Sequence, residues 1–191
     1  MVFWFFYVLR GFRVEGGLRC PVDLVVEVRE LVDYVYCPVK AYLRRGLGVV
    51  EEVEDWREAV RLSGELLVKS GCVEPRYVEA MIRTCEELGP YIAVSPGVAI
   101  PHARPEEGAK AVCFSLLIVR KGVNFGSHND PVYLLIAFAS PDKTSHLKIL
   151  QQLARLLMEK GSVLIERLRR VGSPEEASRI LSGLVGEGER A

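Results

Sequence analysis

Two apolar runs in the second half of the chain most constrain its fold. The runs AVCFSLLIV, residues 111–119, and VYLLIAFA, residues 132–139, are apolar at successive positions rather than only at alternate ones. A strand with apolar side chains on both faces is typical of the centre of a sheet that helices cover on both sides. The two runs therefore predict an α/β layer structure.

Two helices are expected before these runs. The segment EDWREAVRLSGELLVKSG, residues 54–71, predicts a helix with Asp55 as its N-cap and Gly71 as its stop. A second helix opens at Pro75 and closes before Gly89. The apolar residues predicted for the inner faces are Trp56, Ala59, Val60, Leu66, Leu67, Tyr77, Val78, Met81, Ile82 and Cys85.

The remaining elements alternate in the same way. Short β-type runs lie at residues 91–94 and 97–100, and a strong amphipathic helix is expected within residues 140–161. Helical segments at residues 162–170 and 173–185 close the chain. The residues predicted to face inward on the amphipathic helix are Leu147, Leu150, Leu153, Ala154 and Leu157.

The texture of the sequence changes near residue 50. Residues 1–50 mix apolar patches with glycines, whereas clean helical periodicity begins at Glu51. We therefore expect an N-terminal extension at residues 1–50, one domain at 51–187 and a tail at 188–191. The opening run MVFWFFYVL is shorter than the roughly 20 apolar residues of a membrane span, so it predicts a strand, with an interfacial anchor as the alternative.

Size and charge narrow the class of function. A chain of 191 residues builds one core of ordinary size and is too short for a large two-domain enzyme. Lys+Arg and Asp+Glu balance at 25 each, so no positive excess attracts a nucleic-acid backbone or an anionic membrane. We expect neither nucleic-acid binding nor membrane insertion.

The cysteines indicate a reducing compartment. Five of them, an odd number, occur without a CxxC pair, unlike the pattern of a small disulfide-linked secreted domain. We therefore expect a cytoplasmic protein. The five are Cys20, Cys37, Cys72, Cys85 and Cys113.

Three histidines are the candidates for chemistry near pH 7, because only imidazole has an unperturbed pKa in that range. His102 follows a strand-like run in SPGVAIPHARPEEG, with Pro101 fixing the backbone before it and Arg104 two residues on, an arrangement that suits a phosphate. His146 stands in the first turn of the long helix, where free N–H groups favour an anion. His128 lies among turn residues and receives no chemical role.

Other chemistries lack a sequence motif. No HExxH, HxH or Cys/His cluster supplies a local pair of metal ligands, and no GxxxxGK[ST] or suitably placed GxGxxG supplies a nucleotide site. We therefore expect no metal and no cofactor. A phosphate at His102 has to arrive on another carrier.

Residues 52–187 resemble the EIIA domain of the fructose/mannitol type from the bacterial phosphoenolpyruvate-dependent sugar phosphotransferase system (PTS). The similar stretches are WREAVRLSGELLVKSGCVEPRYVEAMI, GPYIAVSPGVAIPHAR and GVNFGSHNDPVYLLIAFASPDKTSHLKILQQLARLL. The wording around the motif is closest to the ascorbate-type branch and the related pentitol-type branch. This resemblance implies a mixed β-sheet flanked by helices.

The resemblance also implies a mechanism. His102 matches the phosphoacceptor histidine and His146 the second active-site histidine. His102 would take a phosphoryl group from phospho-HPr and pass it to a cysteine on an EIIB partner. EIIB and the membrane subunit EIIC would then be separate polypeptides, because this chain contains neither.

Two points depart from the family or stay open. Mannitol-type members hold the phosphate with an arginine on the second helix, where this chain has Thr84 with Arg83 beside it, so Arg104 is the candidate phosphate-binding residue. An EIIA-like regulatory module, in which phosphorylation of His102 controls a protein partner, is the alternative to a transport component. The sequence alone does not distinguish these two functions, and it does not identify the sugar.

Residues 1–50 lie outside this resemblance. Their segment ELVDYVYCPVKAYLRRGLG is similar to the leading cysteine segment of RecB-type iron–sulfur exonucleases associated with CRISPR systems. The three further cluster cysteines and the nuclease core have no counterparts. This favours a residual fusion or a mis-set start codon over a nuclease.

Overall fold

The computed structural model describes residues 46–188, and the side chains of residues 46–181. The strand predicted at residues 1–9 lies outside the described residues, as do most of the predicted extension and residues 189–191 of the predicted tail.

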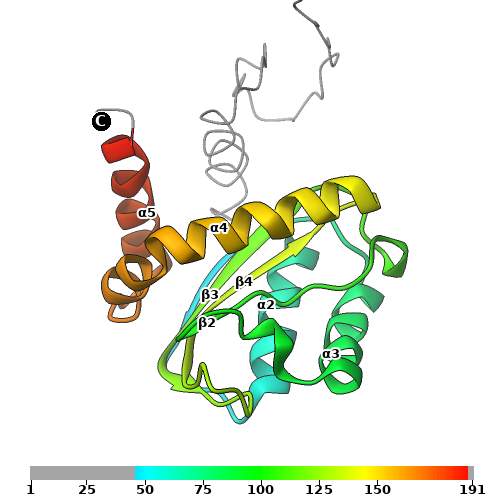
Figure 1. Cartoon of the computed structure of the whole chain (residues 1–191), viewed down its shortest axis with the longest axis horizontal. Coiled ribbons are helices and arrows are strands. Elements are labelled where there is room, and N and C mark those ends of the chain that lie inside the picture. Colours follow the sequence, from blue (N-terminus) through cyan, green and yellow to red (C-terminus); the bar gives the residue numbers. More distant parts are fainter. Residues whose placement is uncertain (1–45, 189–191) are drawn as a thin grey trace, which may run out of the picture. The chain divides into compact units, whose positions relative to one another are not determined.

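A mixed four-stranded sheet forms the centre of the described part (Figure 1). Its order is β1 (Leu47–Val50), β3 (Cys113–Val123), β4 (Val132–Ala139) and β2 (Val98–Ala99). The central pair β3 and β4 is antiparallel, whereas each edge strand is parallel to its neighbour. The prediction that the two apolar runs form the central strands is confirmed.

Helices cover both faces of this sheet. On one face lie α2 (Trp56–Lys69) and α3 (Arg76–Leu88), and on the other lie α4 (Lys143–Leu168) and α5 (Pro174–Gly188) (Figure 1). Side chains along β3 point alternately to the two faces of the sheet. Cys113 and Leu117 pack toward α2 and α3, whereas Phe114 and Ile118 pack toward α4. The predicted α/β layer structure is thus confirmed. In the described residues no helix is long and apolar enough to cross a membrane.

Helices α2 and α3 begin and end close to the predicted residues. The side chain of Asp55 accepts a hydrogen bond of 2.9 Å from the backbone N–H of Glu58, as an N-cap does. Gly71 follows the end of α2 with a φ of 77°, and Gly89 follows α3 with the same φ. Both turns thus use a backbone conformation that side chains disfavour.

Three predicted elements differ in the structure. Residues 91–94 do not form a strand, because Pro90 opens the 3₁₀ turn η1 (Pro90–Ile92). The helices predicted at 140–161 and 162–170 are one helix, α4, because its buried stripe continues through Gly161. That stripe consists of Ile149, Leu153, Leu157, Gly161, Leu164 and Leu168, whereas Leu147 and Ala154 face solvent.

The strand β1 lies within the predicted N-terminal extension. Its residues pair in parallel with β3, from Leu47 opposite Leu116 to Val50 opposite Val119. Residues 47–50 of the predicted extension therefore belong to the sheet. The texture change at Glu51 marks the passage from a strand to the first helix.

A disulfide joins Cys72 to Cys113, a pairing that the sequence analysis did not predict. Both residues are buried, one in the turn between α2 and α3 and the other at the start of β3. The backbone carbonyl of Cys72 also accepts hydrogen bonds from the N–H groups of Lys110 (2.9 Å) and Ala111 (3.3 Å). Covalent and backbone bonds thus fasten the α2–α3 turn to the segment that enters β3.

Candidate active site at the end of β2

His102 lies just beyond the end of β2, and hydrogen bonds fix its ring. The residue is 9% exposed, and its Nδ1 lies 2.8 Å from the carbonyl oxygen of Ile100. Because a carbonyl only accepts, Nδ1 carries the hydrogen and donates it. The lone pair of the neutral ring is therefore on Nε2.

A second imidazole faces this ring. His146 stands in the first turn of α4, and the centroids of the two rings are 5.2 Å apart. Phe138 of β4 packs against both, at 5.1 Å from His102 and 5.0 Å from His146. The structure thus brings together the two histidines that the sequence analysis singled out.

Burial keeps both rings neutral near pH 7. Burial lowers the pKa of His102 below its ordinary 6.5, the carbonyl of Ile100 partly opposes this, and His146 lowers the pKa further. Burial also lowers the pKa of His146, with Glu106 acting in the opposite direction. A neutral imidazole with a free nitrogen is a nucleophile, so His102 has the protonation state that attack on phosphorus requires.

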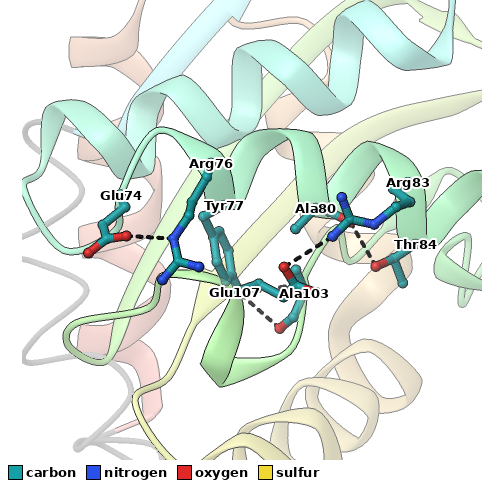
Figure 2. A network of polar contacts seen from close by, with 8 residues as sticks. All are labelled: Glu74, Arg76, Tyr77, Ala80, Arg83, Thr84, Ala103 and Glu107. Carbon is teal, nitrogen blue, oxygen red and sulfur yellow. Dashed lines mark hydrogen bonds and ion pairs between the residues drawn. The ribbon is translucent and has the colours of Figure 1, made fainter.

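Tyr77 of α3 fixes the backbone that follows His102 (Figure 2). Its hydroxyl oxygen accepts a hydrogen bond of 3.1 Å from the backbone N–H of Ala103. The hydroxyl proton is donated to two backbone carbonyls, that of Ala103 at 3.0 Å and that of Phe138 at 3.1 Å. Burial raises the pKa of Tyr77 to about 12, so the hydroxyl remains a donor. One buried side chain therefore ties the His102 loop to β4.

The helix α3 makes a second contact with this loop. Arg83 forms an ion pair of 3.0 Å with Glu107, in the 3₁₀ turn η2 (Pro105–Glu107), and the hydroxyl of Thr84 donates to the carbonyl of Ala80 at 2.7 Å (Figure 2). Arg104 is exposed at the start of η2. Among the described residues it makes no hydrogen bond or ion pair to either imidazole, so the structure does not join it to the histidine pair.

The third histidine, His128, lies apart from this pair. His128 is exposed in the turn between β3 and β4. Within residues 46–188, no cluster of three or more His, Cys, Asp or Glu side chains is arranged to hold a metal ion.

Two tyrosines near His102 were not assigned to the site by sequence reasoning. Tyr77 precedes the histidine by 25 residues and was predicted only as part of a helix core. Tyr91 precedes it by 11 residues in a run predicted as a strand, and its ring meets that of His102 edge-on at 6.0 Å. The sequence signal for Tyr91 is the GPY that opens the run, since Gly-Pro marks a turn.

Comparisons with known proteins identify the family. The profile of the family described as phosphoenolpyruvate-dependent sugar phosphotransferase system, EIIA 2, matches residues 47–183. The ascorbate-specific PTS system EIIA component of Escherichia coli (strain K12) is 39% identical over 127 residues, which cover 65% of this chain and 81% of that protein.

Solved structures show the same fold. The mannitol-specific cryptic phosphotransferase enzyme IIA CmtB from Escherichia coli is similar with a TM-score of 0.63 and 33% identity, covering 72% of this chain and 92% of that one. The complex of enzyme IIAMTL and phosphorylated enzyme IIBMTL from Escherichia coli matches with a TM-score of 0.60 and 29% identity, covering 73% and 95%. Because the family profile covers most of this chain, including both histidines, the chain belongs to the EIIA type 2 family of the phosphoenolpyruvate-dependent sugar phosphotransferase system.

Proposed function

We propose that this protein is a phosphoryl carrier that accepts a phosphoryl group from phospho-HPr on Nε2 of His102 and passes it to a cysteine of an EIIB partner. The observation that carries the proposal is the histidine pair itself. One ring is held by Nδ1 so that Nε2 keeps its lone pair, and the second ring lies 5.2 Å away, centroid to centroid.

The transfer would proceed without a cofactor. The lone pair of Nε2 forms the new N–P bond while the N–P bond of the donor phosphohistidine breaks, and the electron pair of that bond returns to the donor nitrogen. In the second step a thiolate of EIIB attacks the same phosphorus, and the pair of the Nε2–P bond returns to His102. Catalysis then rests on positioning and charge stabilisation, the latter assigned to His146 and the N-terminus of α4.

We also propose that Arg104 is the cation that binds the phosphoryl group. Its side chain is exposed and two residues from His102, so it is able to reach a phosphoryl group that protrudes from Nε2. Arg83 already pairs with Glu107 and would have to leave that contact first.

The names of similar proteins support a proposal for the substrate and the partners. A curated relative is named as ascorbate-specific, and one structural neighbour is a complex with phosphorylated enzyme IIB. We therefore propose a cytoplasmic role in the uptake of ascorbate or a pentitol, with EIIB and the membrane EIIC on other polypeptides.

Intact-mass measurement tests this function. Incubation with phosphoenolpyruvate, Enzyme I and HPr should add one acid-labile phosphoryl group to the protein. His102→Ala should abolish the addition, whereas the matched control His128→Ala, at an exposed turn residue, should retain it. Unchanged labelling of the His102 variant would refute the assignment.

A further inference from the structure

The side-chain hydroxyl of Tyr91 lies near the free nitrogen of His102. Its oxygen lies 3.5 Å from Nε2, and the two rings are nearly perpendicular, at 81°. This separation is longer than a good hydrogen bond from a hydroxyl. The hydroxyl is therefore beside the reactive atom without being strongly engaged by it.

The backbone that carries Tyr91 is fixed to the same strand end. In η1, the carbonyl of Ile92 accepts a 2.8 Å hydrogen bond from the N–H of Ile100, whose own carbonyl holds Nδ1 of His102. The buried side chain of Asn129 donates to the carbonyl of Ala93 at 2.6 Å. Tyr91 and His102 thus keep a constant backbone relation.

The side chain of Tyr91 keeps freedom that its backbone lacks. The residue is 42% exposed, so its ring has room to shift when a group is added at Nε2. Burial of the hydroxyl end raises the pKa of Tyr91, and the neighbouring Cys85 raises it further. The phenol therefore stays protonated and able to donate.

We propose that Tyr91 is a further catalytic residue, whose hydroxyl donates a hydrogen bond to a phosphoryl oxygen during transfer to Nε2 of His102 and in the phosphohistidine that results. The proposal rests on the proposed function, since it requires phosphorylation of His102. When phosphorus bonds to Nε2, the nitrogen loses its lone pair and no longer accepts a hydrogen bond. The phosphoryl oxygens, which carry negative charge, then become the acceptors nearest the hydroxyl.

This role differs from those of the two histidines. His102 supplies the electron pair, and His146 approaches it from α4, whereas Tyr91 approaches it from η1. A neutral donor suits a carrier that both accepts and releases its group, because it stabilises the charge in transit without the stronger hold of a fixed cation.

The test uses the full chain and two phosphoryl donors. Phospho-HPr is the protein donor, and phosphoramidate is a small donor in which the Nε2 attack releases ammonia. The variants are Tyr91→Phe, which removes only the hydroxyl, and Tyr133→Phe, a matched change at a tyrosine that packs against Arg169. We expect Tyr91→Phe to slow phosphorylation about tenfold with both donors, the loss expected for one hydrogen bond to a charged group.

The control results separate the possible outcomes. Tyr133→Phe should keep the wild-type rate, because this hydroxyl lies outside the proposed site. Tyr91→Phe should also shorten the lifetime of isolated phospho-His102, a readout that a merely structural role would not move.

Two outcomes would count against different statements. A wild-type rate for Tyr91→Phe with phosphoramidate would overturn the inference, because a slower reaction with phospho-HPr alone would then reflect contact with the partner protein. A wild-type chain that no donor phosphorylates at His102 would instead refute the proposed function, and this inference with it.

Discussion

Reduction of the Cys72–Cys113 disulfide should lower the free energy of unfolding by about 4 kcal/mol. The two cysteines are 41 residues apart in the sequence, so the bond closes a loop of that length in the unfolded chain. Applying the loop-closure entropy to 41 residues gives this value at 25 °C. Since natural domains are stable by about 5–15 kcal/mol, the bond would supply a large share of the total.

The folded state should survive the loss of the bond. The hydrogen bonds from Lys110 and Ala111 to the carbonyl of Cys72 remain, and Val73 still pairs with Ala109. The effect should therefore appear in the unfolded state, as a lower denaturant midpoint with unchanged native spectra.

Urea unfolding followed by circular dichroism checks this magnitude. The wild type is compared with and without a phosphine reductant, and the variant Cys72→Ala/Cys113→Ala serves as the control that reductant should leave unchanged. Both are prepared with Cys20→Ser and Cys37→Ser, so that these thiols cannot exchange with the bond. A non-reducing peptide map that recovers Cys72 and Cys113 as free thiols after oxidation would refute the reasoning, as would equal reductant effects in both proteins.

Four further predictions follow from the site and the sheet. Tyr77→Phe should cost about 1–3 kcal/mol in the free energy of unfolding, measured by urea, because it leaves a buried N–H of the loop unpaired. The rate of phosphoryl acceptance should fall as the pH drops through the lowered pKa of His102, below its ordinary 6.5, because protonation removes the lone pair of the ring. The free energy of unfolding should also fall as the pH drops from about 6.5 through that lowered pKa, since the unfolded chain binds the proton more readily. His146→Ala should slow transfer about 100-fold in rapid-quench assays yet change stability little, because the residue is only half-buried. Deletion of residues 1–45 should leave a folded, phosphorylatable protein, whereas deletion of residues 1–50 should lower the melting temperature, because it removes the pairing of β1 with β3.

The elements that the sequence predicted well are those whose signal is local. The central strands were evident because both faces are apolar, and α2 and α3 were bounded by cap and stop residues at their ends. By contrast, β1 is four residues long and is recognisable mainly through its partner β3. The disulfide was missed for a similar reason, since spacing alone does not give cysteine connectivity.

The α4 helix shows how tertiary packing selects among apolar residues. Leu147 and Leu153 both occupy helical positions in an amphipathic pattern, yet Leu147 is 61% exposed and Leu153 is buried. The sheet is a narrow surface, and only the stripe that begins at Ile149 lies over it. Leu147, one residue after His146, is therefore exposed to solvent, although the sequence pattern predicted that it faces the core.

The geometry of the candidate site depends on contacts that no motif contains. The motif places His102 directly after a strand, but β2 pairs through only two residues, so the sheet alone does little to orient the ring. Ile100 does so instead, because its N–H holds η1 and its carbonyl holds Nδ1 of His102. This one residue thereby sets the direction of Nε2 and the position of Tyr91 together. The other side chains that contact His102 are Phe138 and His146, which lie far along the chain. The sequence could therefore indicate the two histidines, whereas the hydroxyl of Tyr91 beside them is evident only from the fold.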